Sequence, residues 1–214
     1  MAILERRQLD PPPDGREVLF LLSWAQRAGE ALHGEPGDGG LLTPGAARRC
    51  LVGLLGRLME LCSDVFEAAK NAYMAEAEPL LALDPKLATL EQRAAASGRL
   101  LSELEATGGE CVFARAPLLR GLLERETERF VRAGRELFAR LGRDRGDISR
   151  SLLGTEDFGL VTRISTGAGD LHLHGRSTSV IETQRGRFVY KPRDCGIDRE
   201  LRELVGRVMP DCLG

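Results

Sequence analysis

A chain of 214 residues with a formal net charge of −2 fits one large domain or two small ones, and it is long enough to bury a hydrophobic core. Only 5% of the residues are aromatic, so aliphatic side chains must supply most of that core. With no basic excess, the composition argues against a protein that binds nucleic acid or an anionic membrane surface.

Cysteine usage and the N-terminal sequence bear on the compartment. The five cysteines are odd in number and include no CxxC pair, which predicts reduced thiols rather than a disulfide framework or a zinc site. The first residues, MAILERRQLDPPPDG, hold no apolar stretch of signal-peptide length, and the apolar run at 18–22 is too short to span a bilayer. We therefore expect a cytoplasmic chain without a membrane segment.

Amphipathic helices are predicted before residue 147, because apolar residues recur there at helical spacing. They cover approximately residues 16–32, 43–79, 85–105 and 117–141. Thr43 and Pro44 suit the N-cap and the first position of the second helix. For the third helix we expect an inward face made of Leu87, Leu90, Ala94, Leu101 and Leu104. The apolar stripes indicate core packing, and no constellation of titratable residues accompanies them.

The periodicity changes after residue 146. Residues 147–154 read as a connector, and alternating residues then predict strands at about 160–165, 177–183 and 188–191, with a hairpin turn at 184–187. A short final helix follows, with Asp198 as N-cap and Pro210 as its stop. The predicted fold class is α+β. A helical region covers 1–150, and a small antiparallel sheet that resembles an incomplete kinase N-lobe covers 151–214.

A glycine-rich segment and a lysine stand out in the second region. Gly167, Gly169 and Gly175 mark a turn whose backbone N–H groups can point at phosphate oxygens. Lys191, one of only three lysines among 30 basic residues, ends the third predicted strand. Protein kinases use the same order, a glycine-rich loop followed by a lysine on the third strand, to hold nucleotide phosphates. A hairpin without a ligand and a lysine that reaches solvent are the simpler alternatives.

Acid–base chemistry is indicated within the same segment. Strand alternation would place Asp170 and His172 on one face, where a carboxylate can orient an imidazole for proton transfer. His174 would share that face, but metal ligation by His172 and His174 lacks an evident third ligand. In a kinase, the final helix would supply a glutamate for the strand lysine. Glu200 and Glu203 are the candidates, and solvated surface glutamates are the alternative.

Two motifs in this region resemble a known family. The sequence GDLHLHGRSTSV from Gly169, followed after a short hairpin by VYKPR from Val189, is similar to the dehydratase domain of type 2 lanthipeptide synthetases, the LanM family. Members of that family carry a GDxHxxGRxV stretch and a VYKPR strand at this separation. The passage over 129–165 also resembles the family's lead-in, whereas the helical N-terminal part fits only loosely.

The resemblance implies a lipid-kinase-like fold that uses ATP and Mg²⁺ to phosphorylate Ser and Thr of a precursor peptide. The same site then eliminates phosphate to leave dehydroalanine or dehydrobutyrine. By position, Lys191 matches the family's lysine on the nucleotide, and Asp170 and His172 match the residues of the elimination step. Arg176 and Arg193 lie in the motifs and are expected to contact phosphate.

The chain departs from the family beyond these motifs. It has no counterpart of the catalytic-loop aspartate, the Mg²⁺-binding pair, the C-terminal lobe or the zinc cyclase domain. We therefore expect that this polypeptide alone does not dehydrate peptides, and that it is a truncated reading frame, a fragment, or one part of a split enzyme. The alternatives are a non-catalytic module that binds a leader peptide or a partner protein, and a stand-alone nucleotide-binding regulator.

Overall fold

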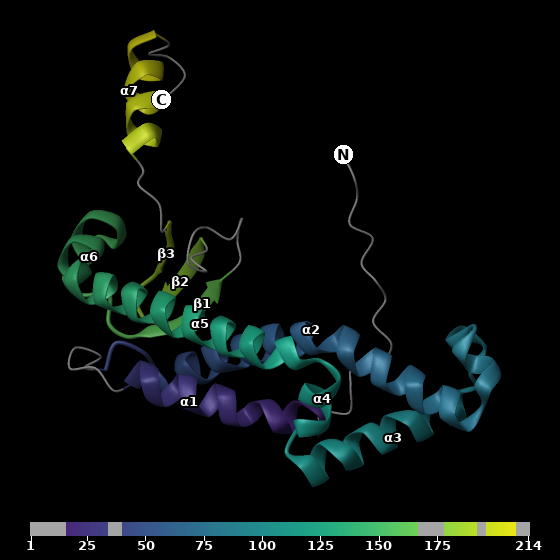
Figure 1. Ribbon diagram of the computed structural model, residues 1–214. Coiled ribbons are helices and arrows are strands. Elements are labelled where there is room, and N and C mark those ends of the chain that lie inside the picture. Colours follow the sequence, from purple (N-terminus) through teal and green to yellow (C-terminus); the bar gives the residue numbers. More distant parts are fainter. Residues whose placement is uncertain (1–15, 34–39, 167–177, 192–195, 209–214) are drawn as a thin grey trace. The chain divides into compact units, whose positions relative to one another are not determined.

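The computed structural model describes residues 16–33, 40–166, 178–191 and 196–208 (Figure 1). It has the expected α+β class: most described residues are helical, and three strands form one small antiparallel sheet. The chain divides into two compact units. Unit 1 comprises Met1–Ala31 and Leu51–Phe130, and unit 2 comprises Leu32–Cys50 and Val131–Gly214. This division does not coincide with the predicted boundary near 150, which stays a prediction.

The helices before residue 145 largely follow the predicted ones. They are the 3₁₀ helix η1 (Arg16–Leu21), α1 (Leu22–His33), α2 (Pro44–Ala77), the 3₁₀ helices η2 (Pro79–Ala82) and η3 (Pro85–Leu87), α3 (Leu90–Thr107), α4 (Glu110–Arg115) and α5 (Pro117–Arg143). The predicted start of the second helix is confirmed, because the Thr43 hydroxyl accepts a hydrogen bond from the Ala46 N–H at 3.2 Å. Helix α4 was not predicted.

The prediction for the third helix was wrong in its start and its inward face. Helix α3 begins at Leu90, where Thr89 and Gln92 form a reciprocal capping box. Its buried residues are Ala96, Leu100 and Leu104, spaced by four residues, whereas Leu87, Leu90 and Ala94 are exposed. The later start explains the error, because Pro85–Leu87 form the separate 3₁₀ helix η3 and do not continue the helical face.

Unit 1 is a helical assembly around one stripe of α2. Leu54, Leu58, Cys62 and Phe66 recur every four residues and are at most 2% exposed. Phe20 of η1 packs edge-on against Phe66, with ring centroids 5.9 Å apart, and against Phe113 of α4 at 6.3 Å. These contacts join η1, α2 and α4 through aromatic rings.

Tyr73 is the polar centre of unit 1. Its hydroxyl donates to Glu103 Oε2 at 2.6 Å and accepts from Arg115 Nη2 at 3.0 Å. The guanidinium groups of Arg99 and Arg115 lie 4.3 and 4.7 Å from the ring centroid. Arg99 also pairs with Glu76 at 2.6 Å. This network ties α2, α3 and α4 together, and the two arginines are balanced by two glutamates.

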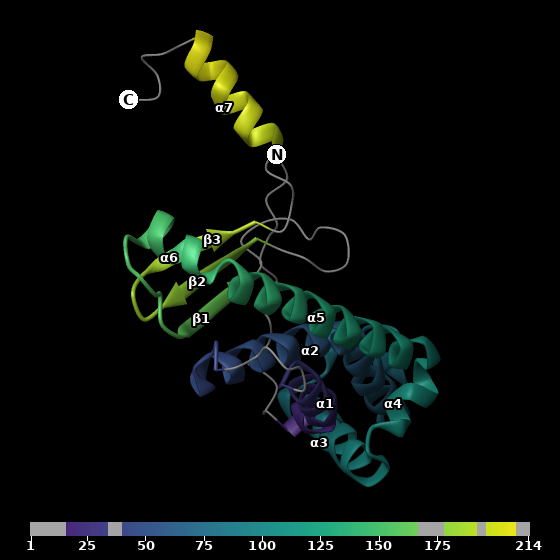
Figure 2. The same cartoon turned by 90° about the vertical axis from the view of Figure 1, so that its left-hand side faces the viewer.

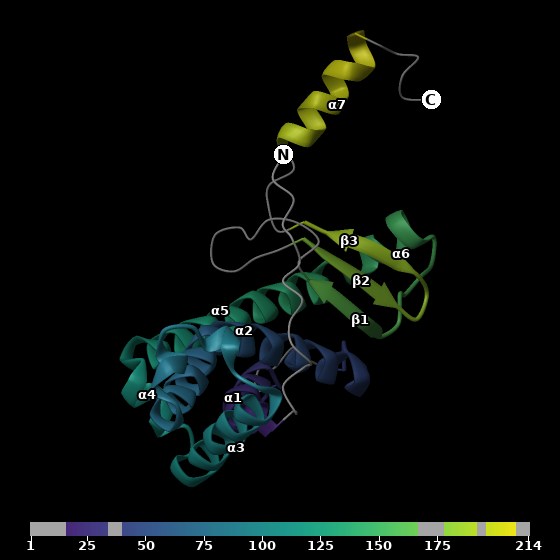
Figure 3. The same cartoon turned by 90° about the vertical axis from the view of Figure 1, so that its right-hand side faces the viewer.

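Unit 2 contains the sheet. Helix α6 (Arg145–Leu153) precedes strands β1 (Val161–Thr166), β2 (Ser179–Thr183) and β3 (Arg187–Tyr190), and α7 (Gly196–Val208) follows them. The strand order is β1-β2-β3 with both pairs antiparallel (Figures 2 and 3). The predicted strands are confirmed to within two residues at their starts, but the connector predicted at 147–154 is largely helix α6.

A segment distant in sequence extends the sheet. The Val161 N–H donates to Leu41 O at 2.8 Å, and the Thr43 N–H donates to Val161 O at 2.9 Å. This parallel bridge places the lead-in to α2 beside β1. Nothing in the local pattern of residues 41–43 indicates the pairing, because it depends on a strand more than a hundred residues later.

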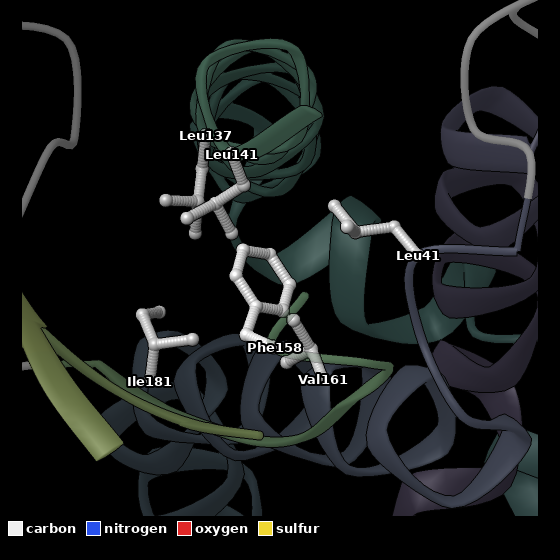
Figure 4. Packing of buried hydrophobic residues seen from close by; sticks show 6 residues of the cluster. All are labelled: Leu41, Leu137, Leu141, Phe158, Val161 and Ile181. Atoms are coloured by element: carbon white, nitrogen blue, oxygen red, sulfur yellow. The ribbon is translucent and has the colours of Figure 1, made fainter. Parts of the chain in front are cut away.

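The core of unit 2 lies on one face of the sheet. Leu137 and Leu141 of α5 point toward Phe158, and Val161, Ile181 and Leu41 complete the buried cluster (Figure 4). Phe158, Val161 and Ile181 are fully buried. Phe188 and Tyr190 of β3 pack against the same cluster. Burial of this face sets which side of each strand is available for other contacts.

Helix α7 begins earlier than predicted. It starts at Gly196, so Asp198 lies in its first turn and is not its N-cap. Within its expected apolar stripe, Leu201 and Leu204 are each 57% exposed and Val208 is 69% exposed. Glu200 and Glu203 are exposed, and Glu203 lies 3.9 Å from Arg207 of the next turn. Among the described residues, no helix is both long and apolar enough to cross a bilayer.

Two adjacent glycines give a test of the packing in unit 1. Gly108 and Gly109 have φ values of +59° and +91°, so an alanine at either position is strained. A Cβ at Gly109 would lie 2.7 Å from Phe20 Cδ2, whereas a Cβ at Gly108 meets nothing within 4 Å. We predict that Gly108→Ala lowers the free energy of unfolding by about 1–2 kcal/mol, the cost of the left-handed conformation. Gly109→Ala should cost roughly 1–3 kcal/mol more, because Phe20 must move.

Urea unfolding of both variants measures the two costs. Equal destabilisation by the two alanines would show that Phe20 is not fixed by its neighbours.

The pKa of Tyr73 gives a second test. Burial, and then the hydrogen bond to Glu103, raise it to about 12. Because the pKa of Tyr73 is higher in the folded than in the unfolded chain, its neutral form stabilises the fold. This stabilisation is fully present below the tyrosine pKa of the unfolded chain, about 10, and is lost as the pH rises through about 12. In a Tyr190→Phe background, Tyr73 is the single tyrosine of the chain. We predict that its tyrosinate absorbance appears well above pH 10, together with loss of helical ellipticity.

Tyrosinate formation near pH 10 in a chain that is still helical would contradict this prediction. The Tyr73→Phe variant, which removes the titrating group, is the control.

Candidate functional site

The candidate site is the end of the sheet at which both sequence motifs attach. The strand register places Thr166, Ser179 and Tyr190 in one row across β1, β2 and β3. Residues 167–177 leave β1 directly after Thr166, and Lys191 follows β3 directly after Tyr190. Neighbouring strands lie about 4.8 Å apart, so the row spans about 10 Å. The two motifs therefore start from the same short edge.

Of the predicted site residues, some lie inside the part of the chain that the structure describes and others lie outside it. Lys191 is described, and its side chain is exposed at the end of β3. The others lie outside the described residues: Gly169, Asp170, His172, Gly175 and Arg176 in 167–177, and Arg193 in 192–195. The structure thus brings the attachment points of both motifs together. The proximity of Asp170 and His172 to Lys191 stays a prediction.

The two faces of the sheet differ in chemistry. Phe188 and Tyr190 face the core, while Val189 between them is 56% exposed. Val189 pairs in register with Val180 on the neighbouring strand, so these valines share the outer face. Alternation predicts that Lys191 lies on the face of Val189. The outer face would then carry this apolar pair close to an ammonium group.

A row of charges borders the valine pair. Arg163, Glu182 and Arg187 are neighbours in register on the outer face, two residues closer to the hairpin than the valine pair. Arg163 Nη1 lies 3.9 Å from Glu182 Oε1, and both side chains are exposed. Such a pair contributes at most about 1 kcal/mol to stability. Our sequence reasoning missed this face, although the alternation of polar and apolar residues along the strands carries the signal.

The opposite end of the sheet is held rigidly. Gln184 in the hairpin turn accepts the Leu160 N–H through Oε1 at 2.9 Å, and its own N–H donates to Leu160 O at 3.0 Å. Gly159 has a φ of +75°, and a Cβ there would collide with the Gln184 side chain. Only glycine therefore allows the chain entering β1 to approach the hairpin this closely. The contact fixes the end of the sheet remote from Lys191.

A network of hydrogen bonds fixes Phe158 against the sheet. Ser149 is fully buried, and its hydroxyl accepts the Phe158 N–H at 2.9 Å and donates to Arg145 O at 2.7 Å. Arg145 binds Asp157 through two hydrogen bonds of 2.7 and 3.0 Å. These bonds, and then the Gly159 N–H, hold the pKa of Asp157 below its usual value. The stability from this pair is therefore lost as the pH falls below about 4.

The described residues offer no obvious metal centre. No group of three or more His, Cys, Asp or Glu side chains gathers anywhere in the ranges that the structure describes. The candidate site is thus defined by the lysine, the outer valine pair and the segments that start from the row of Thr166, Ser179 and Tyr190.

A family profile matches the second half of the chain. The sequence profile of a family described as a domain of unknown function (DUF4135) matches residues 117–211, just under half of the chain. This domain is associated with lanthionine synthetase-like proteins. The matched range includes α5, α6, the sheet, α7 and both sequence motifs. No curated protein matches the chain.

The contribution of Phe158 to the sheet can be measured. Phe158 is fully buried, its ring centroid lies 6.2 Å from that of Phe188, and it packs in the cluster with Ile181. We predict that Phe158→Ala lowers the free energy of unfolding by about 3–5 kcal/mol, because a large cavity opens beneath the strands. Leu152→Ala is the matched control, since Leu152 on α6 is 63% exposed and should cost less than about 1 kcal/mol.

Denaturant unfolding followed by circular dichroism provides both values. Similar costs for the two substitutions would mean that the sheet does not depend on the Phe158 cluster.

Proposed function

We propose that the chain carries the nucleotide-binding edge of a lanthipeptide synthetase dehydratase. The reaction would be ATP-dependent phosphorylation of Ser and Thr in a precursor peptide, followed by elimination of phosphate to dehydroamino acids. Support comes from the GDLHLHGR and VYKPR motifs and from the family profile over 117–211. The single observation that carries the proposal is the common row of Thr166, Ser179 and Tyr190, from which both motifs extend.

The outer face fits ATP at the level of chemistry. The half-buried Val180 and the exposed Val189 form an apolar pair suited to a purine ring, and Lys191 follows two residues after Val189 toward the open end. An ammonium group there would neutralise phosphate charge, which is the main requirement of phosphoryl transfer. Gly169 and Gly175 would allow the backbone to approach the phosphates. Bound ATP would supply the phosphoryl group for the peptide hydroxyl.

Further charged groups are assigned from the motifs. Arg176 and Arg193 would add bidentate contacts to phosphate oxygens, which the guanidinium geometry favours. Mg²⁺ remains an expectation of the resemblance. The described residues do not offer a ligand set for it, and no step is derived through the ion.

The elimination step would use the acid–base pair of the glycine-rich segment. Asp170 would orient the His172 imidazole, and this pair would take the proton from the α-carbon of the phosphorylated residue. The electrons of that C–H bond form the new double bond, and phosphate leaves from the β-carbon with the electrons of the C–O bond. Lys191 and the two arginines would stabilise the departing phosphate.

A second candidate function is a non-catalytic module that binds an apolar stretch of the precursor peptide. One observation in unit 1 favours it. Leu80, Leu83, Leu87 and Leu90 fall within eleven residues and are each at least 67% exposed. Large apolar side chains that are exposed in one contiguous patch mark binding surfaces, and this function requires the four leucines to form such a patch. Peptide binding that survives Lys191→Ala but is lost when these leucines become serine would favour this function.

Nucleotide binding by the full chain tests the first function. We predict that ATP with Mg²⁺ binds in calorimetry and that Lys191→Ala weakens the affinity at least about tenfold, since a charge-assisted hydrogen bond contributes about 1.5–3 kcal/mol. Lys86→Ala is the matched control, because Lys86 is an exposed lysine on η3 in unit 1. Its affinity for ATP should equal that of the wild type.

Failure of the wild-type chain to bind ATP, or equal losses in both lysine variants, would contradict the proposal. Mass spectrometry of a Ser- and Thr-rich precursor peptide, incubated with the chain, ATP and Mg²⁺, then tests the expectation that this chain alone does not dehydrate peptides.

A further inference from the structure

Strand β3, at the end of the described sheet, packs against the core of unit 2 through one of its two faces. β3 pairs with β2 and stands at the end of the order β1-β2-β3. Its two aromatic residues, Phe188 and Tyr190, pack against the buried cluster of unit 2, and Val189 between them is 56% exposed. A slip of one residue would move every side chain to the opposite face. The aromatic pair therefore opposes that slip.

Tyr190 occupies the position in β3 that matters most for Lys191. It is the final residue of the strand, immediately before the lysine, and it pairs with Ser179, which is only 3% exposed. Adjacent residues of an extended strand point to opposite faces. A ring held on the core face at position 190 thus directs the next side chain to the outer face.

Tyr190 also packs against the cluster that contains Leu137 and Leu141 of α5. The pKa of Arg143 is raised chiefly by its hydrogen bond to Asp144 and the charge of that carboxylate, with a smaller contribution from Tyr190. The phenol is therefore within electrostatic reach of the C-terminal turn of α5. Arg143 Nε donates to Asp144 Oδ1 at 2.7 Å, so this turn carries its own ion pair.

We propose that Tyr190 is a positioning residue that holds the Lys191 ammonium on the outer face of the sheet, beside Val180 and Val189. The proposal rests on the proposed function in one respect, namely that Lys191 binds phosphate. Tyr190 acts through the lysine and does not itself contact the nucleotide. Its ring is needed for packing, so phenylalanine should replace it and alanine should not.

The small number of lysines allows a direct test. Reductive methylation with ¹³C-formaldehyde labels the amines of Lys70, Lys86 and Lys191 together with the N-terminus, and Lys191→Arg assigns the signal of interest. We expect Tyr190→Ala to shift the Lys191 resonance and to leave those of Lys70 and Lys86 in place. Tyr190→Phe should leave all three unchanged. If Tyr190→Ala does not fold, Tyr190→Leu provides the same comparison.

A matched control separates positioning from general loosening of the core. Leu153 on α6 packs against the same buried cluster, but it lies on a different element from the lysine. Leu153→Ala should therefore leave the Lys191 resonance unchanged. An unshifted Lys191 signal in folded Tyr190→Ala, or equal shifts in Tyr190→Ala and Leu153→Ala, would overturn the proposal.

Nucleotide affinity supplies the second readout. Tyr190→Ala should weaken ATP binding by about tenfold in the wild-type background and have no further effect in Lys191→Ala, because the two residues act as a unit. Additive losses would overturn the proposal. A wild-type chain that binds no ATP would refute the proposed function, while the lysine spectra would still decide whether Tyr190 positions Lys191.

Discussion

Unit 2 depends on one constraint, the burial of a single face of its three-stranded sheet. Ile181 and Phe158 are fully buried against Leu137 and Leu141 of α5. Because strand residues alternate between faces, this burial determines which residues remain outside. The valine pair lies on the outer face for that reason, and alternation predicts the same for Lys191. The hydrophobic core thus shapes the candidate site without contributing a side chain to it.

One end of the sheet is closed by hydrogen bonds, and the other end carries the sequence motifs. The hairpin end is closed by Gln184 and Leu160, which exchange two hydrogen bonds, and Gly159 allows this close approach. The hydrogen bonds of Ser149, Arg145 and Asp157 hold the chain segment that enters β1. The other end carries the segments with the glycine-rich motif and the lysine. A site built on a rigid sheet with one fixed end can place a ligand more accurately than a loop alone.

Unit 1 has the character of a scaffold. Its buried residues are aliphatic and aromatic, and its most prominent polar group, Tyr73, is satisfied by Glu103 and Arg115. The charges of Arg99 and Arg115, which lie over the Tyr73 ring, are balanced by those of Glu76 and Glu103. The network therefore serves packing between helices. Unit 1 also carries large apolar side chains that are exposed, among them Leu80, Leu83, Leu87 and Leu90.

The sequence alone determined the α+β class, the long helices and the three strands, because periodicity and capping residues such as Thr43 are local properties. It also identified Lys191 and the Asp170–His172 pair as candidates from spacing and resemblance. Only the tertiary structure decided that Leu41 and Thr43 pair with β1, that α3 buries Ala96 and Leu100, and that Val180 and Val189 share the outer face. Each of these depends on contacts between residues far apart in the chain, which no local pattern records.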